Sequence, residues 1–253
     1  ILRLTPRNHA GQHVVRWRVE IDADARLRQS EDAFGNIVQT LNTAGAIESF
    51  SIHVEGEVET TDNAGILSGA VERFPPEFYL RSTDLTQIDE AMAAYSKDLR
   101  HGAGRPADRL SLLHALMAGL HRDIRFDAGP TDASTPAAES FANRHGVCQD
   151  HTHIFCAMAR HLGAPARYVS GYFRRSDGVI DQQAGHAWAE AWMPELGWVG
   201  FDVANGVCVT GAHVRVAVAL DYLGAAPVRG SRLGGRGETL DVTIRVMELQ
   251  MQA

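Results

Sequence analysis

The sequence predicts an α+β fold, in which an antiparallel β domain precedes a core built of helices and then strands. Segments of residues 1–74 alternate apolar and polar side chains with the period of two that is typical of strands. Residues 84–162 change to the helical period, and residues 166–249 return to a period of two. Helices and strands that are segregated along the chain in this way favour α+β over a doubly wound parallel sheet.

The N-terminal domain is predicted to be a small antiparallel sheet or sandwich. Residues 12–21 alternate apolar and polar side chains, and residues 47–58 do so more sharply. Turn-forming residues at 34–36 and 62–65 separate these segments from their neighbours. The Pro75-Pro76 pair is the expected border of this domain.

The border divides the chain into a β-rich domain of residues 1–75 and a core of residues 76–253 with strands at its C-terminal end.

The core is predicted to open with helices. Asp84 can cap the first helix, with Gln87 three residues later in the capping-box position. Pro106 suits the first turn of a second helix. A third begins at Cys148 and stops at Gly163. The residues expected to face the core are Leu85, Ile88, Met92, Tyr95 and Leu99 in the first helix, Leu110, Leu113, Leu116, Met117 and Leu120 in the second, and Ile154, Phe155, Met158, Ala159 and Leu162 in the third.

Strands are predicted after the third helix, where the apolar period becomes two. The expected segments are residues 166–173, 184–192, 197–203, 213–220 and 238–249.

The composition of the chain limits the classes of partner and the cellular compartment that we expect for it. The chain has 253 residues and a formal net charge of −7, which argues against a nucleic-acid partner because phosphate binding needs a basic face. No run approaches the roughly 18 apolar residues that span a bilayer, so we expect no membrane partner. Three cysteines are an odd and sparse number for a disulfide framework, so a reducing compartment, the cytoplasm, is expected.

Cys148 follows Gly146-Val147 at the predicted start of the third helix. The positive end of the helix dipole favours thiolate over thiol, and a thiolate is a nucleophile for acyl transfer. The backbone N–H groups of the same turn can hold a developing oxyanion. Taken alone, Cys148 would more often be a small buried core residue, as most free cysteines are.

His186 and Asp202 supply the partners that a catalytic thiolate needs. His186 begins a predicted strand, where its imidazolium could stabilise the thiolate and later give a proton to a leaving amine. Asp202 ends the next apolar strand, where a poorly hydrated carboxylate needs a partner, and orienting an imidazole is one such partnership. The plainer alternatives are a structural histidine and an aspartate that starts the turn 202–206.

Together the motifs around these residues are specific. They are Gly146-Val147-Cys148-Gln149-Asp150, Leu162 to Tyr172, Gly185-His186-Ala187-Trp188-Ala189-Glu190 and Gly197-Trp198-Val199-Gly200-Phe201-Asp202, with Leu2 to Arg7 at the start and Asp221-Tyr222 near the end. In the residues of these motifs and in their order, the chain resembles bacterial transglutaminase-like proteins over essentially its whole length. One departure is Val203-Ala204, where the family often has Pro-Thr, although Asn205-Gly206 keeps the turn.

The resemblance implies a papain-like core in which the helix that carries the cysteine packs on an antiparallel sheet. It implies Cys148 as nucleophile, His186 as base and Asp202 as orienting acid. We assign Trp188 and Gln149, which lie beside these residues in the motifs, to substrate binding. The family includes protein cross-linkers, peptidases, peptide N-glycanases and non-enzymatic relatives.

We therefore expect acyl transfer on a peptide or protein amide, most simply as a cysteine peptidase or amidase that needs no cofactor and no metal. Protein-glutamine cross-linking and a non-catalytic binding module of the same fold stay as alternatives. A third alternative, an acyltransferase that uses coenzyme A, would share the triad but not the residues of these motifs. A metal site is a further rival, since Zn accepts Cys and His ligands. No standard metal spacing occurs in the cluster that would form it, which is His145, Cys148, His151, His153 and Cys156.

Overall fold

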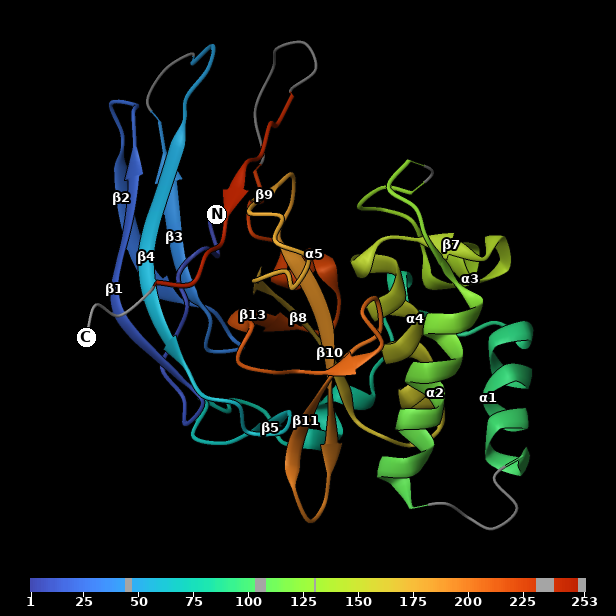
Figure 1. Cartoon of the computed structure of the whole chain (residues 1–253). Helices are drawn as coiled ribbons and strands as arrows, with labels where there is room; N and C mark the ends of the chain where they lie inside the picture. The colour runs from blue at the N-terminus through green and yellow to red at the C-terminus, as the bar shows by residue number, and fades with distance from the viewer. Residues whose placement is uncertain (44–46, 103–107, 130, 231–238, 250–253) are drawn as a thin grey trace.

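The computed structural model describes residues 1–43, 47–102, 108–129, 131–230 and 239–249. A central antiparallel sheet lies between a group of helices on one side and the N-terminal strands on the other (Figure 1). None of the described helices combines the length and the apolar character needed to cross a bilayer. The α+β class predicted from the sequence is confirmed.

The N-terminal strands form two antiparallel pairs. Strand β1 (Gln12–Ile21) pairs with β4 (Ile52–Thr60), and β2 (Arg26–Glu31) pairs with β3 (Ile37–Asn42). The predicted strand 47–58 begins late, at Ile52, because its partner β1 ends at Ile21, opposite Ile52, and earlier residues have no ladder to join.

Strand β5 (Ile66–Leu67) ends the N-terminal region on the edge of the central sheet, where it pairs with β11 (Gly197–Asp202). A buried ion network also connects the two regions. The Arg167 guanidinium contacts Glu72 at 2.7 Å and Glu190 at 2.6 Å, and Glu190 also accepts from Arg215. Burial alone would raise the pKa of Glu190, but the two guanidinium groups lower it to about 2. The division at residues 75 and 76 stays a prediction.

The helical layer consists of α1 (Glu90–Gly102), α2 (Arg109–Asp123), α3 (Ala137–Asn143) and α4 (Cys148–His161). The predicted cap of the first helix is wrong. Asp84 begins a single 3₁₀ turn, η2 (Asp84–Thr86), which follows another, η1 (Pro76–Leu80). The cap is Asp89, whose Oδ1 accepts from the Met92 N–H at 2.8 Å. Both aspartates precede apolar residues at helical spacing, so the local sequence alone did not show which of them caps the helix.

The second helix is described from Arg109, and Asp108 accepts from the Ser111 N–H at 2.8 Å as its cap. Pro106, the predicted start, lies outside the described residues.

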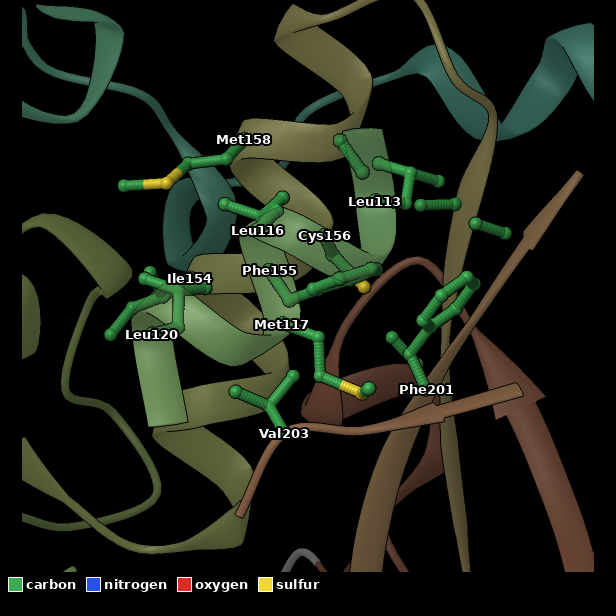
Figure 2. Close-up of a cluster of buried hydrophobic side chains, with 14 of the residues drawn as sticks. Leu113, Leu116, Met117, Leu120, Ile154, Phe155, Cys156, Met158, Phe201 and Val203 are labelled. Atoms are coloured by element: carbon green, nitrogen blue, oxygen red, sulfur yellow. The ribbon is translucent and has the colours of Figure 1, made fainter. Parts of the chain in front are cut away.

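The main core lies between α2, α4 and the sheet (Figure 2). Phe155 of α4 stacks on Phe201 of β11 with ring centroids 5.1 Å apart. Cys156 is fully buried among these side chains, so it is a core residue. Each large apolar side chain buried here stabilises the fold by roughly 1.5–3 kcal/mol. This packing fixes α4, and with it Cys148 at the helix start, against the sheet. The labelled members of the cluster are Leu113, Leu116, Met117, Leu120, Ile154, Phe155, Cys156, Met158, Phe201 and Val203.

The central sheet has the strand order β12-β11-β10-β8-β13, all neighbours antiparallel. Four of the predicted core strands are confirmed within two residues. These four are β8 (Ala166–Phe173), β10 (His186–Met193), β11 (Gly197–Asp202) and β13 (His213–Ala219). The short strand β12 (Val207–Cys208) was not predicted, and α5 (Tyr222–Ala225) follows β13.

The predicted final strand, residues 238–249, is mostly wrong. Residue 238 lies outside the described residues, and in residues 239–249 only β14 (Ile244–Arg245) is a strand, paired with β9 (Asp181–Gln182). Leu240 and Leu249 are exposed, so the alternation in this segment does not mark a buried face. A short parallel pair, β6 (Arg125–Phe126) with β7 (His145–Gly146), lies just before α4.

Candidate active site

Cys148 occupies the first turn of α4, and the residues around it hold that turn in place. Asp150 Oδ2 accepts from the Val147 N–H at 2.8 Å and from Thr131 Oγ1 at 2.7 Å. Asp150 therefore binds the amide at the helix start and stabilises the turn that carries Cys148. The Cys148 side chain is half-buried at the edge of the core, at the helix end where N–H groups have no partner within the helix.

His186 is the first residue of β10. Its Nε2 lies 2.7 Å from Asp202 Oδ2, and Cys148 is close enough to raise the pKa of the ring. Because Nε2 is used by Asp202, Nδ1 is the nitrogen left for Cys148. Burial by itself lowers the pKa of His186, but the interactions of the ring with Asp202 and Cys148 raise it to about 10. The imidazole therefore stays protonated beside the thiol over the physiological pH range.

Asp202 reaches His186 because of the strand register. It ends β11 one residue beyond the Ala189–Phe201 pair, so it lies diagonally across from the start of β10. The carboxylate is completely buried. Burial alone would raise the pKa of Asp202, but hydrogen bonds from His186, His213 and Asn205 hold it well below its usual range. The structure thus brings the three predicted catalytic residues together, with His186 between Cys148 and the Asp202 carboxylate to which it is hydrogen-bonded.

Two further residues bind the same carboxylate, and neither was predicted from the sequence to belong to the site. Asn205 Nδ2 donates to Asp202 Oδ2 at 2.6 Å, and its backbone N–H donates to Oδ1 at 3.2 Å. His213 Nε2 lies 3.0 Å from Oδ2. The turn motif Asn205-Gly206 was a possible signal for the first. No local signal pointed to His213, because strand order places its strand β13 three positions from β11. The contact forms because the sheet curls at this end.

Aromatic side chains enclose both histidines. The Phe173 ring lies 4.9 Å from the His186 ring and 4.6 Å from the His213 ring. The Trp188 ring lies 5.2 Å from His213 and 6.1 Å from His186, and its side chain is only 1% exposed. Gly171 leaves room for it, since a Cβ there would lie 2.7 Å from the indole. Trp188 therefore packs against the two histidines and presents no exposed surface that a substrate could contact, contrary to the predicted substrate-binding role.

Gln149, the other predicted substrate contact, lies partly exposed next to Cys148. Its Nε2 donates to the Asp132 carbonyl at 3.1 Å, which connects the helix start to the loop before α3. Tyr168 and Tyr222 also pack beside Cys148, and the sequence analysis gave them no role. Burial raises the pKa of both phenols, and the charge of Cys148 adds to this effect.

The predicted rival metal cluster does not assemble. His151 turns both ring nitrogens toward backbone carbonyls, those of Val147 and Ile124, and His153 Nε2 accepts from the Tyr222 N–H. These nitrogens are already committed to the protein.

Within the described part of the chain, the side chains that do converge at metal-ligand distance are His186, Asp202 and His213, whose ligand atoms lie within 4.8 Å of one another. They do not suit a metal ion. Thr210 N–H donates to His213 Nδ1 at 3.1 Å, so the proton of that ring is on Nε2. That nitrogen faces Asp202 as a donor and has no lone pair for a metal.

Comparison with known proteins agrees with this architecture. Residues 93–203 match the family model described as transglutaminase-like superfamily, and residues 1–59 match the one described as bacterial transglutaminase-like N-terminal region. An uncharacterised protein of Mycobacterium leprae is 28% identical over 262 residues, which covers 98% of this chain and 91% of that protein. A protein-glutamine gamma-glutamyltransferase of Pseudomonas aeruginosa is 27% identical over 155 residues, 56% of this chain and 23% of that protein.

Among solved structures, a protein of Cytophaga hutchinsonii described as a candidate cysteine protease has a similar fold. It is 21% identical in sequence, with a TM-score of 0.73, and the match covers 96% of this chain and 82% of that one.

Proposed function

The chain is a transglutaminase-like superfamily protein with a bacterial transglutaminase-like N-terminal region, and on this premise we propose that it is a cysteine peptidase or amidase acting through Cys148. The observation that carries the proposal is the placement of Cys148 at the helix start beside His186, whose ring is hydrogen-bonded to the buried Asp202 carboxylate. A thiol, an imidazole and a carboxylate connected in this order are the parts of a nucleophilic acyl-transfer site.

In the first half-reaction the Cys148 thiolate attacks the carbonyl carbon of a peptide or protein amide. The carbonyl oxygen becomes an oxyanion, which backbone N–H groups of the first turn of α4 are oriented to bind. As the C–N bond breaks, the His186 imidazolium gives its proton to the leaving nitrogen. The products are a free amine and a thioester on Cys148.

In the second half-reaction neutral His186 takes a proton from water, and the resulting hydroxide attacks the thioester carbonyl. The C–S bond breaks, the acid leaves, and Cys148 returns as thiolate beside imidazolium. Asp202 stays ionised throughout and keeps the imidazole oriented. No cofactor or metal takes part in this sequence of steps.

Protein-glutamine cross-linking is the nearest alternative, because an amine can replace water in the second half-reaction. A cross-linker must admit an amine and hold water back, which needs an apolar passage to the thioester. Trp188, the aromatic side chain nearest His186 in the motif, would be a candidate wall of such a passage. It is only 1% exposed, and a wall must be exposed to the passage, so its burial supports hydrolysis.

A non-catalytic binding module is the alternative from a different class. It would need neither a protonated His186 nor a buried carboxylate aligned on it. A buried ion pair is seldom more stabilising than apolar residues of the same size, so stability alone does not explain its presence here, which favours an enzyme.

One experiment separates these three possibilities. The protein is incubated with a library of peptide amides and a large excess of a labelled primary amine, and both products are followed by mass spectrometry. We expect free acid to predominate. Predominant incorporation of the amine would make the protein a cross-linker, and no product of either kind would favour a binding module.

The matched controls are Cys148→Ala, which should abolish both products, and Cys208→Ala, which removes another partly buried thiol and should change neither. Cytoplasmic localisation belongs to the same proposal, because a catalytic thiol must stay reduced.

A further inference from the structure

His213 makes the contact that the proposed mechanism leaves unused. Its imidazole is completely buried at the start of β13, and Nε2 lies 3.0 Å from Asp202 Oδ2. The residue is eleven positions beyond Asp202 in the chain and comes from a strand that is not a neighbour of β11 in the sheet. Nothing in the first or second half-reaction requires this second imidazole to exchange a proton.

The hydrogen bonds of His213 fix its tautomer. The Thr210 N–H donates to Nδ1 at 3.1 Å, so Nδ1 is an acceptor and the ring proton is on Nε2. Nε2–H can then only donate, and the acceptor in reach is Asp202 Oδ2. Phe173 and Trp188 pack against the ring, with centroids 4.6 and 5.2 Å away, and the Thr210 N–H favours the orientation in which Nε2 faces Asp202.

Asp202 Oδ2 is therefore held from three sides. It accepts from His186 Nε2 at 2.7 Å, from His213 Nε2 at 3.0 Å and from Asn205 Nδ2 at 2.6 Å. Asn205 belongs to the turn that follows β11 and can move with it. His213 is anchored in another strand, so it fixes the carboxylate relative to the rest of the sheet.

We propose that His213 is a positioning residue, whose fixed Nε2–H holds the Asp202 carboxylate on His186 and so keeps the other nitrogen of His186 on Cys148. The inference rests on the proposed function, because it acts through the same Cys148 and His186. Without the donor the carboxylate can rotate about its Cβ–Cγ bond. The His186 imidazolium then samples more orientations and spends less time with its other nitrogen on Cys148. The thiolate loses stabilisation even though every group that touches the substrate is intact.

The test compares two variants of His213. In His213→Gln the terminal amide lies at about the reach of the imidazole Nε2 and can still donate to Asp202. His213→Met has a similar length but no donor. His153→Met is the matched control, since His153 is an equally buried imidazole with one backbone hydrogen bond and no contact with Asp202.

The readout is the rate at which iodoacetamide labels Cys148 across the acid pH range, which needs no substrate. The ionisable groups around the pair are Asp202, His213 and, beside the sulfur, Tyr168 and Tyr222. Burial raises the pKa of both phenols, so neither titrates in this range. The fall in labelling rate toward low pH, the acid limb of the profile, therefore measures how well the imidazolium stabilises the Cys148 thiolate.

We expect labelling at pH 6 to fall by up to about tenfold in His213→Met and its acid limb to move to higher pH, because the lost hydrogen bond acts on the thiolate only through Asp202 and His186. His213→Gln should recover most of the rate, and His153→Met should keep the wild-type limb. A His213→Met protein with a lowered melting temperature and an unshifted limb would overturn the inference, since a purely structural role predicts that result.

Two further outcomes are decided separately. If wild-type Cys148 shows no fast labelling at pH 6, the proposed function itself fails, whatever the variants do. If His213→Met does not fold, ¹⁵N NMR of the wild-type histidine rings still tests the inference. An unprotonated Nδ1 and a protonated Nε2 on His213 support it, and the opposite tautomer or a doubly protonated ring overturns it.

Discussion

Replacing Asp202 by Asn is the substitution whose consequences can be worked out most fully. The side chain keeps its shape, but one carboxylate oxygen becomes an NH₂ group. If that group takes the place of Oδ2, it meets three donors, from His186, His213 and Asn205. If it takes the place of Oδ1, it meets only the Asn205 backbone N–H, 3.2 Å away. The amide oxygen will therefore face His186, and the hydrogen bond survives without its negative charge.

The size of the effect follows from that change. A hydrogen bond to a charged group contributes roughly 1.5–3 kcal/mol, and a neutral one about 1 kcal/mol. Each ~1.4 kcal/mol is one pKa unit, so the pKa of His186 should fall by about one unit from its value of about 10. His186 then stays protonated at neutral pH and can still face Cys148 as an imidazolium.

Turnover is more sensitive than the thiolate. Loss of the orienting carboxylate costs up to about 10⁴-fold in serine-protease triads, because the imidazole is no longer held in one tautomer and orientation. We therefore expect Asp202→Asn to lower peptide-amide hydrolysis by roughly 10²- to 10⁴-fold while iodoacetamide labelling of Cys148 at pH 7 falls less than about tenfold.

The assay measures hydrolysis, labelling and melting temperature on the same samples. Asp221→Asn is the matched control, because Asp221 is also a buried carboxylate but accepts from the Gly224 N–H and does not contact His186. It should leave hydrolysis nearly unchanged. Full turnover in Asp202→Asn would remove Asp202 from the mechanism, and an equal loss in both variants would show that the effect is one of stability.

Three other predictions follow from the same site. Brief iodoacetamide treatment near pH 6 should label Cys148 well ahead of Cys156 and Cys208, since burial raises the pKa of Cys156 to about 11 and also that of Cys208; equal labelling of all three would contradict a thiolate–imidazolium pair. Because folding raises the pKa of His186 from 6.5 to about 10, its contribution to stability, of the order of a few kcal/mol, is fully present below pH 6.5 and is lost as the pH rises through about 10. The melting temperature should therefore fall over that interval in the wild type and much less in His186→Gln, and parallel curves would refute the shift. EDTA should change neither hydrolysis nor melting temperature, whereas a stoichiometric zinc ion lost together with activity would show that a metal is part of the site.

Much of the fold was predictable because its signals are local. The third helix was predicted to begin at Cys148, and the structure begins it there, because Val147 and Asp150 fix that turn within four residues. The strand from Ala166 to Phe173 was predicted with both ends correct. Where two signals of equal strength lay close together, at Asp84 and Asp89, the sequence did not distinguish them, and tertiary packing selected the second.

The sequence by itself determined which residues have the chemistry of the site. A cysteine at a helix start, a histidine at a strand start and an aspartate at the end of the next strand are each defined by neighbours within a few positions. Antiparallel pairing of those two strands then brings His186 and Asp202 together. Only the tertiary structure decided what holds Asp202. His213 reaches it because the sheet curls until β13 meets the end of β11, and a sheet's curvature depends on packing across all its strands, which no short segment of sequence encodes.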